Sequence, residues 1–210
     1  SRLFMYLILK RQNMNTNVKY IIATSLILII QSYNFMAIAD TEKQKYSVVH
    51  SEDGFEVRFY PASILATVYS DAKTYRDLAY PGFRKLAGYI FGSNESDTKI
   101  SMTSPVHMEF SKEVSSMSFV MPSSFSEENL PRPTDQAVKI EKTEDIYMAA
   151  IRFGGYASDK KIRDYSDKLR SLLDKKEISW YGNFRYLGYN PPFQVFGRKN
   201  EIIVPVRWPE

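Results

Sequence analysis

The chain has 210 residues, and among them are two histidines, His50 and His107, and no cysteine. Structural zinc sites use cysteine and histidine ligands at short, regular spacings, and neither histidine has such a neighbour. The lack of cysteine excludes disulfides, thiolate metal sites and a cysteine nucleophile. The sequence therefore predicts no structural zinc site, and we interpret each histidine as an ordinary surface or rim residue.

The residue patterns of the common enzyme classes are missing from the chain. No serine stands in a Gly-x-Ser-x-Gly turn. Phe153-Gly-Gly155 has neither the spacing nor the context of a phosphate loop or a dinucleotide fingerprint. Glu56 and Arg58 fall on one face of an expected strand, where we interpret them as a structural pair. We therefore predict a protein that is not an enzyme.

A cluster of aromatic and basic residues lies in a segment that is predicted to be a helix. Asp77 can cap this helix, which runs to about Phe91 and is ended by Gly92. Two apolar stripes follow the helical period: Ala79, Phe83, Leu86 and Ile90, which suit packing on a sheet, and Tyr80, Ala87 and Phe91, with Arg84 between them. Two interpretations remain open: the helix is broadly buried, or its second stripe faces a ligand.

The stretch from Lys99 to Pro122 is the centre of the expected sheet. Its apolar residues alternate with polar ones over 100–110 and again over 117–121, which is the period of half-buried strands. Pro105 interrupts the first limb, so a bulge or a strand edge is expected there. Further strands are predicted over 46–50, 55–60, 64–70, 138–140, 147–155, 184–189 and 202–206.

A second helix is predicted from Ser158, its cap, to about Lys176, with Ile162, Leu169 and Leu173 among its inward residues. The order strand, strand, helix, strands then appears twice, over 55–121 and over 138–206. Helices that interrupt antiparallel-type strands indicate an α+β fold.

The first 39 residues differ in composition from the rest of the chain. They hold four basic residues, no acid and the uncharged apolar run 20–30, and Ala37-Ile-Ala39 has the form of a signal-peptidase site. We predict an N-terminal extension and signal peptide over 1–39 and one domain over 40–210, secreted or exported after cleavage near Ala39. The alternative is a retained membrane anchor, although eleven apolar residues are few for a span of about 20.

The net charge of the predicted domain argues against one class of partner. The whole chain carries 28 Lys and Arg against 24 Asp and Glu, and the four excess cations all precede Asp40. The remaining 24 cations balance the 24 acids, so no basic surplus is left to drive non-specific phosphate binding. We therefore predict no nucleic-acid partner.

Several short motifs occur in a fixed order. Lys99-Ile-x-Met-Thr-x-Pro-Val106 and Ser116-Met-x-Phe-Val-Met-Pro122 form the centre. Around them stand the segments Glu56-Val-Arg-Phe-Tyr-Pro61, Phe83-x-x-Leu-x-x-Tyr-Ile-x-Gly92, Phe153-Gly-Gly155, Tyr189-Asn-Pro-Pro192 and Arg198-Lys-Asn-Glu201. This ordered set, from about Tyr46 to Val206, resembles the SOUL / haem-binding protein family.

The resemblance implies a fold and a function. The implied fold is a distorted antiparallel β-barrel built of two similar halves, with two flanking helices. The implied function is non-covalent binding of haem or another porphyrin, as a buffer or carrier. Porphyrin is a flat hydrophobe with two propionates, so an apolar surface with nearby cations suits it. The candidate haem-binding residues are Tyr80, Phe83, Arg84, Ala87, Phe91 and Phe193.

The sequence departs from the family pattern at the iron ligand. Some members carry a histidine where Phe59 stands here, and phenylalanine cannot ligate iron. Some members also place basic residues at the positions of Tyr80 and Gly88. His107 is a weak candidate for axial ligation. Two other functions stay open: a small-molecule effector-binding or protein-interaction module of the same fold, and a tetrapyrrole-modifying enzyme.

Overall fold

The computed structural model describes residues 16, 20–21, 24–25, 41–52 and 54–209. The chain forms two compact units, Ser1–Thr41 and Glu42–Glu210. The predicted cleavage site at Ala37-Ile38-Ala39 and most of the apolar run 20–30 lie outside the described residues, so the signal peptide stays a prediction. Among the residues that are described, no helix has the length and apolar content needed to cross a bilayer.

The second unit contains two helices and eleven strands within its described residues. The helices are α3 (Tyr75–Ile90) and α4 (Asp159–Lys175). The strands are β1 (Glu42–Lys43), β2 (Ser47–Glu52), β3 (Phe55–Tyr60), β4 (Ile64–Ser70), β5 (Thr103–Ser104), β6 (Val106–Glu109), β7 (Ser115–Val120), β8 (Val138–Lys142), β9 (Ile146–Gly154), β10 (Arg185–Gly188) and β11 (Lys199–Pro205). The predicted α+β class is confirmed.

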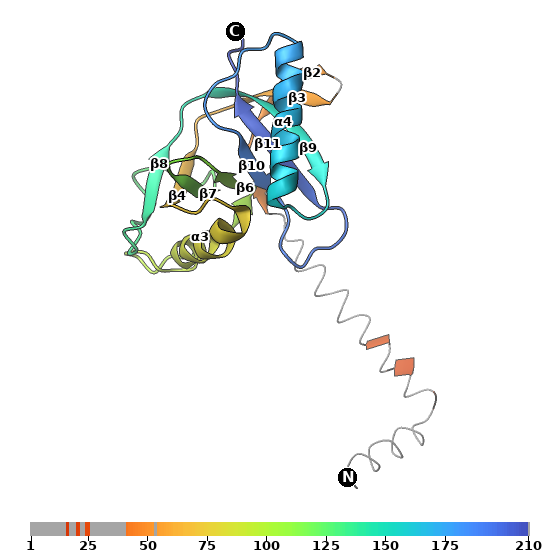
Figure 1. Ribbon diagram of the computed structural model, residues 1–210. Helices are drawn as coiled ribbons and strands as arrows, with labels where there is room; N and C mark the ends of the chain where they lie inside the picture. Colours follow the sequence, from red (N-terminus) through yellow and green to blue (C-terminus); the bar gives the residue numbers. More distant parts are fainter. Residues whose placement is uncertain (1–15, 17–19, 22–23, 26–40, 53, 210) are drawn as a thin grey trace. The chain divides into compact units, whose positions relative to one another are not determined.

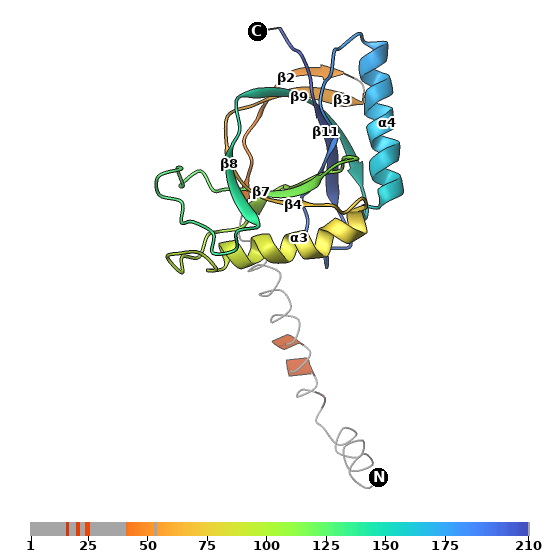
Figure 2. The same cartoon turned by 60° about the vertical axis from the view of Figure 1, so that its left-hand side comes forward.

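Nine strands form one antiparallel sheet in the order β2-β3-β9-β11-β10-β6-β7-β4-β8. The sheet curls strongly, and α3 and α4 lie outside the curl (Figures 1 and 2). Its edges are β2 and β8, and within the described residues no ladder joins them. A large antiparallel sheet with two helices is therefore established, whereas closure into a barrel is not.

The two halves predicted from the sequence are visible in the strand order. The first half is β3-β4-α3-β6-β7 and the second is β8-β9-α4-β10-β11. Exchanging each element with its counterpart reverses the order of the eight strands from β3 to β8. In each half the first strand pairs with the other half, β3 with β9 and β8 with β4, so neither half completes its sheet alone.

The central strand β7 is buried on both of its faces, where the sequence predicted a half-buried strand. Met117 and Phe119 belong to the core cluster beneath α3, which also contains Leu86. Ser118 points to the inner face, where its Oγ lies 2.9 Å from Thr67 Oγ1. The prediction was wrong because polar alternation here reflects a hydrogen-bonded interior and not solvent.

Pro105 interrupts the first limb of the central stretch, as predicted. Its peptide bond with Ser104 is cis, and it separates the two-residue strand β5 from β6. β5 leaves the main sheet and pairs in parallel with β1. The N-terminal segment of the domain is thereby fixed beside the central stretch.

Helix α3 begins earlier than predicted. Thr74 is the N-cap, and its Oγ1 accepts a hydrogen bond from the Asp77 amide at 3.1 Å. Asp77 is therefore the third residue of the first turn, where its carboxylate accepts a bond from Thr74 Oγ1 at 2.6 Å. This reciprocal arrangement is a capping box.

The phase of α3 on the sheet also differs from the prediction. Leu86 and Ile90 are buried as expected, but Ala79 is only half-buried and Phe83 is 42% exposed. The other residues of the buried face are Leu78, Gly82 and Tyr89. Gly82 allows the close approach, since a Cβ there would lie 3.2 Å from Met117 Sδ.

Helix α4 follows the prediction closely. Ser158 is its N-cap and Lys176 its C-cap, and Ile162, Leu169 and Leu173 are its buried residues. They pack on β9 and β11. The second half of the sheet is therefore covered as the sequence indicated.

Candidate functional site

The outer face of α3 carries the candidate ligand-binding residues. Tyr80, Phe83 and Phe91 are 73%, 42% and 65% exposed, Ala87 is half-buried, and Arg84 is exposed. Their spacing along the helix keeps them on one side of it. The broadly buried alternative for this helix is therefore wrong, because its aromatic stripe points away from the sheet.

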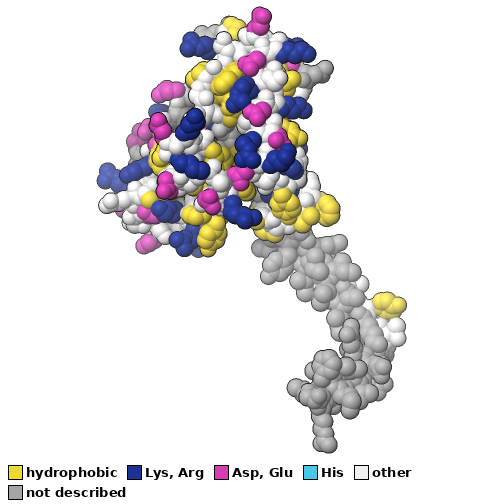
Figure 3. Space-filling view, in the orientation of Figure 1, with side chains coloured by type: hydrophobic (Ala, Val, Ile, Leu, Met, Phe, Trp, Pro, Cys, Tyr) yellow, Lys and Arg dark blue, Asp and Glu magenta, His cyan; other side chains and the backbone are white. Residues whose placement is uncertain are grey.

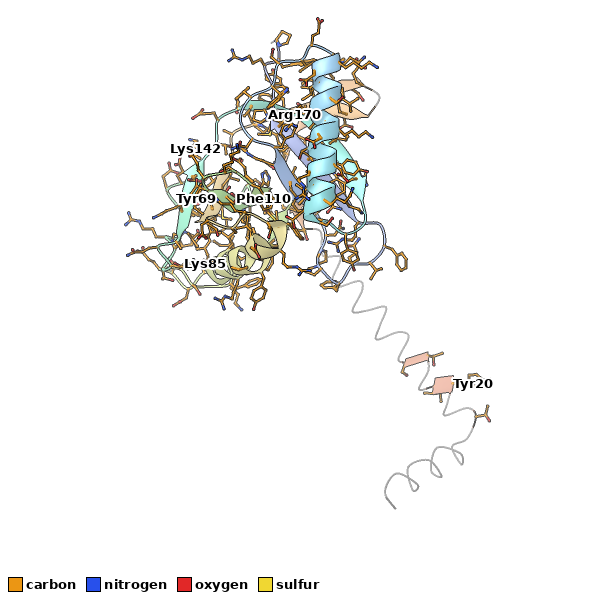
Figure 4. All side chains as sticks on the ribbon, viewed as in Figure 1. Tyr20, Tyr69, Lys85, Phe110, Lys142 and Arg170 are labelled. Carbon is orange, nitrogen blue, oxygen red and sulfur yellow. The ribbon has the colours of Figure 1, made fainter. Side chains whose placement is uncertain are left out.

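Phe83 connects this outer face to the core. Its ring meets the buried ring of Phe119 edge to face, with the centroids 5.3 Å apart. The contact holds Phe83 in place while a large part of its surface stays in solvent. Lys85 on α3 is also exposed, and Figure 4 labels it beside the helix. The face thus combines an apolar surface with two cations, Arg84 and Lys85.

Phe193 lies in the loop that joins β10 to β11. The loop residue is 76% exposed, as a ligand-contacting side chain can be before binding. The start of α3 lies near the strand that enters this loop, since Tyr75 meets Tyr186 of β10 edge to face at 5.5 Å. Figure 3 shows hydrophobic side chains along one margin of the domain, over α3 and over this loop.

His107 is buried in the structure, which corrects its interpretation as a surface or rim residue. It lies opposite Ser118 and Leu187 on the inner face of the sheet and is 7% exposed. Its Nε2 donates to Gln44 Oε1 at 2.8 Å. Burial, with a smaller contribution from the charge of Arg185, lowers the pKa of His107 to about 3. It is a neutral imidazole with a partner at one nitrogen.

His50 is partly exposed at the edge strand β2. Its Nε2 lies 3.3 Å from Glu52 Oε1, and its ring is 5.1 Å from that of Trp208. Among the described residues, no three His, Cys, Asp or Glu side chains gather as metal ligands would. The structure therefore gives each histidine a local partner within the protein.

The buried position of His107 predicts a pH dependence of stability. In the unfolded chain a histidine has a pKa of about 6.5, so the unfolded state binds the proton more tightly. The free energy of unfolding should therefore fall as the pH falls from about 6.5 towards 3, by up to about 1.4 kcal/mol per pH unit. Urea unfolding at a series of pH values measures this slope.

His107→Gln is the matched variant, because it keeps a polar partner for Gln44 without a titrating group. Its stability should be flatter between about pH 6.5 and 4.5, a range that lies above the ordinary titration of carboxyl groups. Equal slopes in both proteins over this range would contradict the assignment of the pH dependence to His107.

A buried ionic cluster, which the sequence analysis found only in part, occupies the inner face near β3 and β11. Arg58 donates to both carboxylate oxygens of Glu201, at 2.9 and 3.1 Å. The predicted pair with Glu56 is also present, at 2.7 Å from Arg58 Nε. Arg58 is 4% exposed and Glu201 fully buried.

Further hydrogen bonds complete the cluster around Glu201. Tyr189 Oη donates to its Oε2 at 2.6 Å, and Lys199 Nζ lies 3.0 Å from its Oε1. Burial alone would raise the pKa of Glu201, but the hydrogen bonds and charge of Arg58 hold it below the ordinary value. One signal was present in the sequence: an acid that directly precedes the apolar strand residues 202–204.

Comparisons with known proteins agree with this fold. The family model described as "SOUL heme-binding protein" matches residues 41–205. "Heme-binding protein 1" of Xenopus laevis is 30% identical over 156 residues, which cover 70% of this chain and 81% of that protein. "Heme-binding protein 2" of Mus musculus is 29% identical over 156 residues, covering 70% and 76%.

A solved structure extends the similarity of fold to a more distant protein. The "EcmrR C-terminal domain" has a TM-score of 0.58 at 10% identity, covering 77% of this chain and 98% of that one. At this identity the likeness concerns the fold alone.

Proposed function

Because this chain belongs to the SOUL heme-binding protein family, we propose that its folded domain binds haem or a related porphyrin on the outer face of α3. The observation that carries the proposal is the exposed stripe of Tyr80, Phe83, Ala87 and Phe91. A large flat hydrophobe gains most of its binding energy by burying such a surface. The relatives' names point to the same ligand class.

The cations beside the stripe suit the polar edge of the ligand. Arg84 and Lys85 are both exposed on α3, from which charge-assisted hydrogen bonds can reach carboxylates. Phe193 from the β10–β11 loop would cover the ring from the other side. In this arrangement the helix supplies the surface, the cations orient the propionates, and the loop limits access of water.

We propose that apolar contact rather than an iron–protein bond dominates the affinity. His107 lies in the interior with its Nε2 bonded to Gln44, and Phe59 has no ligating atom. Neither residue belongs to the outer face of α3. Metal-free protoporphyrin should accordingly bind within about tenfold of haemin, or about 1.4 kcal/mol.

We further propose the biological setting that the sequence indicates. The domain would act as a buffer or carrier of the porphyrin, exported by the segment 1–39 and acting without turnover. The curled sheet would serve as a distorted barrel that holds the two helices rigidly on its outside. Immunoblotting of cell fractions for a shortened chain tests the export.

Haemin titration tests the binding proposal, followed by the Soret band and by quenching of tyrosine and tryptophan emission. We expect Phe83→Ala and Ala87→Asp to weaken binding by about 1–3 kcal/mol, through lost contact or a charge facing the ring. His107→Ala should leave the affinity nearly unchanged. Circular dichroism first establishes that each variant is folded.

Ser171→Asp is the matched control for Ala87→Asp, since it adds the same charge at an exposed position of α4. It should bind haemin like the original protein. Loss of binding on His107→Ala with normal binding by the α3 variants would replace the helix-face site with axial ligation. No saturable change at micromolar haemin would reject porphyrin binding altogether.

Two other functions are separated by the same titration. Indifference to haemin and to protoporphyrin would favour an effector-binding or protein-interaction module, whose fold the EcmrR C-terminal domain shares. Formation of a changed tetrapyrrole would favour an enzyme.

A further inference from the structure

The loop between β10 and β11 carries an apolar tip that the proposed haem site uses only in part. Phe193, Val195 and Phe196 are 76%, 57% and 87% exposed. Phe196 has the highest exposed fraction of the large hydrophobic side chains in the described residues. Three such side chains within four residues form an exposed apolar protrusion, which indicates an interaction site.

The protein holds this tip in a defined conformation. Arg198 Nη1 donates to the carbonyl oxygens of Pro191 and Gln194, at 2.8 and 2.7 Å. The Lys199 amide donates to Asn190 Oδ1 at 2.6 Å, which closes the base of the loop. These bonds cross-link the loop to itself. Its apolar side chains therefore remain presented outward and do not fold back onto the core.

The surroundings of the tip are basic. Residues 189–200 contain no acid, and Arg198 and Lys199 follow the tip directly. Lys161 lies at the same end of the domain, since its Nζ donates to the carbonyl of Gly154, the register partner of Lys199. The guanidinium of Arg198 lies 4.5 Å from the ring of Tyr156, which is itself exposed. Apolar and aromatic tips flanked by cations suit the headgroup boundary of an anionic bilayer.

We propose that this tip docks the domain on a lipid surface, with Val195 and Phe196 entering the acyl boundary and the cations facing anionic headgroups. A narrow protrusion flanked by charge fits a bilayer, which needs no complementary pocket. The apolar run 20–30 independently indicates that the chain meets a membrane during its biogenesis. The inference goes beyond porphyrin binding and does not depend on it.

The absence of cysteine allows a site-specific test on the full chain. A fluorescent NBD label on Phe196→Cys reports the tip, whatever the N-terminal segment does. Lys175→Cys is the matched control, because Lys175 is exposed in the last turn of α4, about 24 Å along the helix from its first residue. Each labelled protein is mixed with phosphatidylcholine vesicles that do or do not contain phosphatidylserine.

We expect the label at 196, and not the label at 175, to shift to shorter emission wavelength and to be quenched by spin-labelled lipid. Omission of phosphatidylserine should weaken this response about tenfold, as expected for loss of attraction to the nearby cations. A label at 196 that stays in water in the presence of vesicles would overturn the proposal, as would equal responses at both positions.

Haemin is the second probe in this experiment. A label at 196 that responds to haemin but never to vesicles would assign the whole tip to the porphyrin site and would also overturn lipid docking. The Soret titration without vesicles reports porphyrin binding separately. Failure of one proposal is therefore distinguishable from failure of the other.

Discussion

Arg58→Ala should lower the free energy of unfolding by about 3–5 kcal/mol, because it leaves the carboxylate of Glu201 buried without its main partner. Glu201 is fully enclosed and accepts both of its short bonds to Arg58 inside the curled sheet. Truncation removes the compensating charge but not the cost of burying the remaining one. Urea or thermal unfolding of the two proteins measures the difference.

Two further variants test this explanation. Lys160→Ala breaks an ion pair with Asp164 that lies in solvent, and it should cause little measurable loss. The double variant Arg58→Met, Glu201→Leu removes both charges and should recover much of the stability, since apolar residues can replace a buried pair. Similar losses for Arg58→Ala and Lys160→Ala would contradict a special role for the buried pair.

Leu86→Ala should cost about 2–5 kcal/mol of stability, whereas Phe83→Ala should cost about 1 kcal/mol. Leu86 is completely buried between α3 and the sheet, so its truncation leaves a cavity. Phe83 is on the opposite side of the phase boundary and gives up only its contact with Phe119. Urea unfolding of both variants measures the two costs.

The comparison also decides how the porphyrin experiments are interpreted. A small cost at Phe83 allows a binding loss in Phe83→Ala to be assigned to the ligand face. If Phe83→Ala were as destabilising as Leu86→Ala, α3 would be rotated towards the arrangement that the hydrophobic pattern alone suggested. The outer face would then lose its central aromatic residue.

The difference between α3 and α4 shows where sequence patterns suffice. In α4 the cap at Ser158 and a single apolar stripe leave one way to place the helix on the sheet. In α3 two apolar stripes compete, and the residue that decides between them is Gly82. A glycine carries no hydrophobic signal, yet its lack of a side chain lets the helix backbone approach Met117.

The candidate site was accessible to the sequence only through the ordered motifs. The aromatic and basic residues of α3 could be named from their spacing, but their exposure could not. Phe193 could be placed in a loop, whereas the bonds from Arg198 that hold this loop became visible only in the folded chain.

Local patterns determined most elements of this protein: the strands by their period of two, α4 by its cap and stripe, the break at Pro105, and the repeated element order. These signals are contained within a few consecutive residues, so they survive without knowledge of the fold. Tertiary structure alone decided that β3 and β8 cross to the other half and that His107 faces the interior. It also joined Arg58 to Glu201 across 143 residues of chain, because such contacts depend on which strands become neighbours.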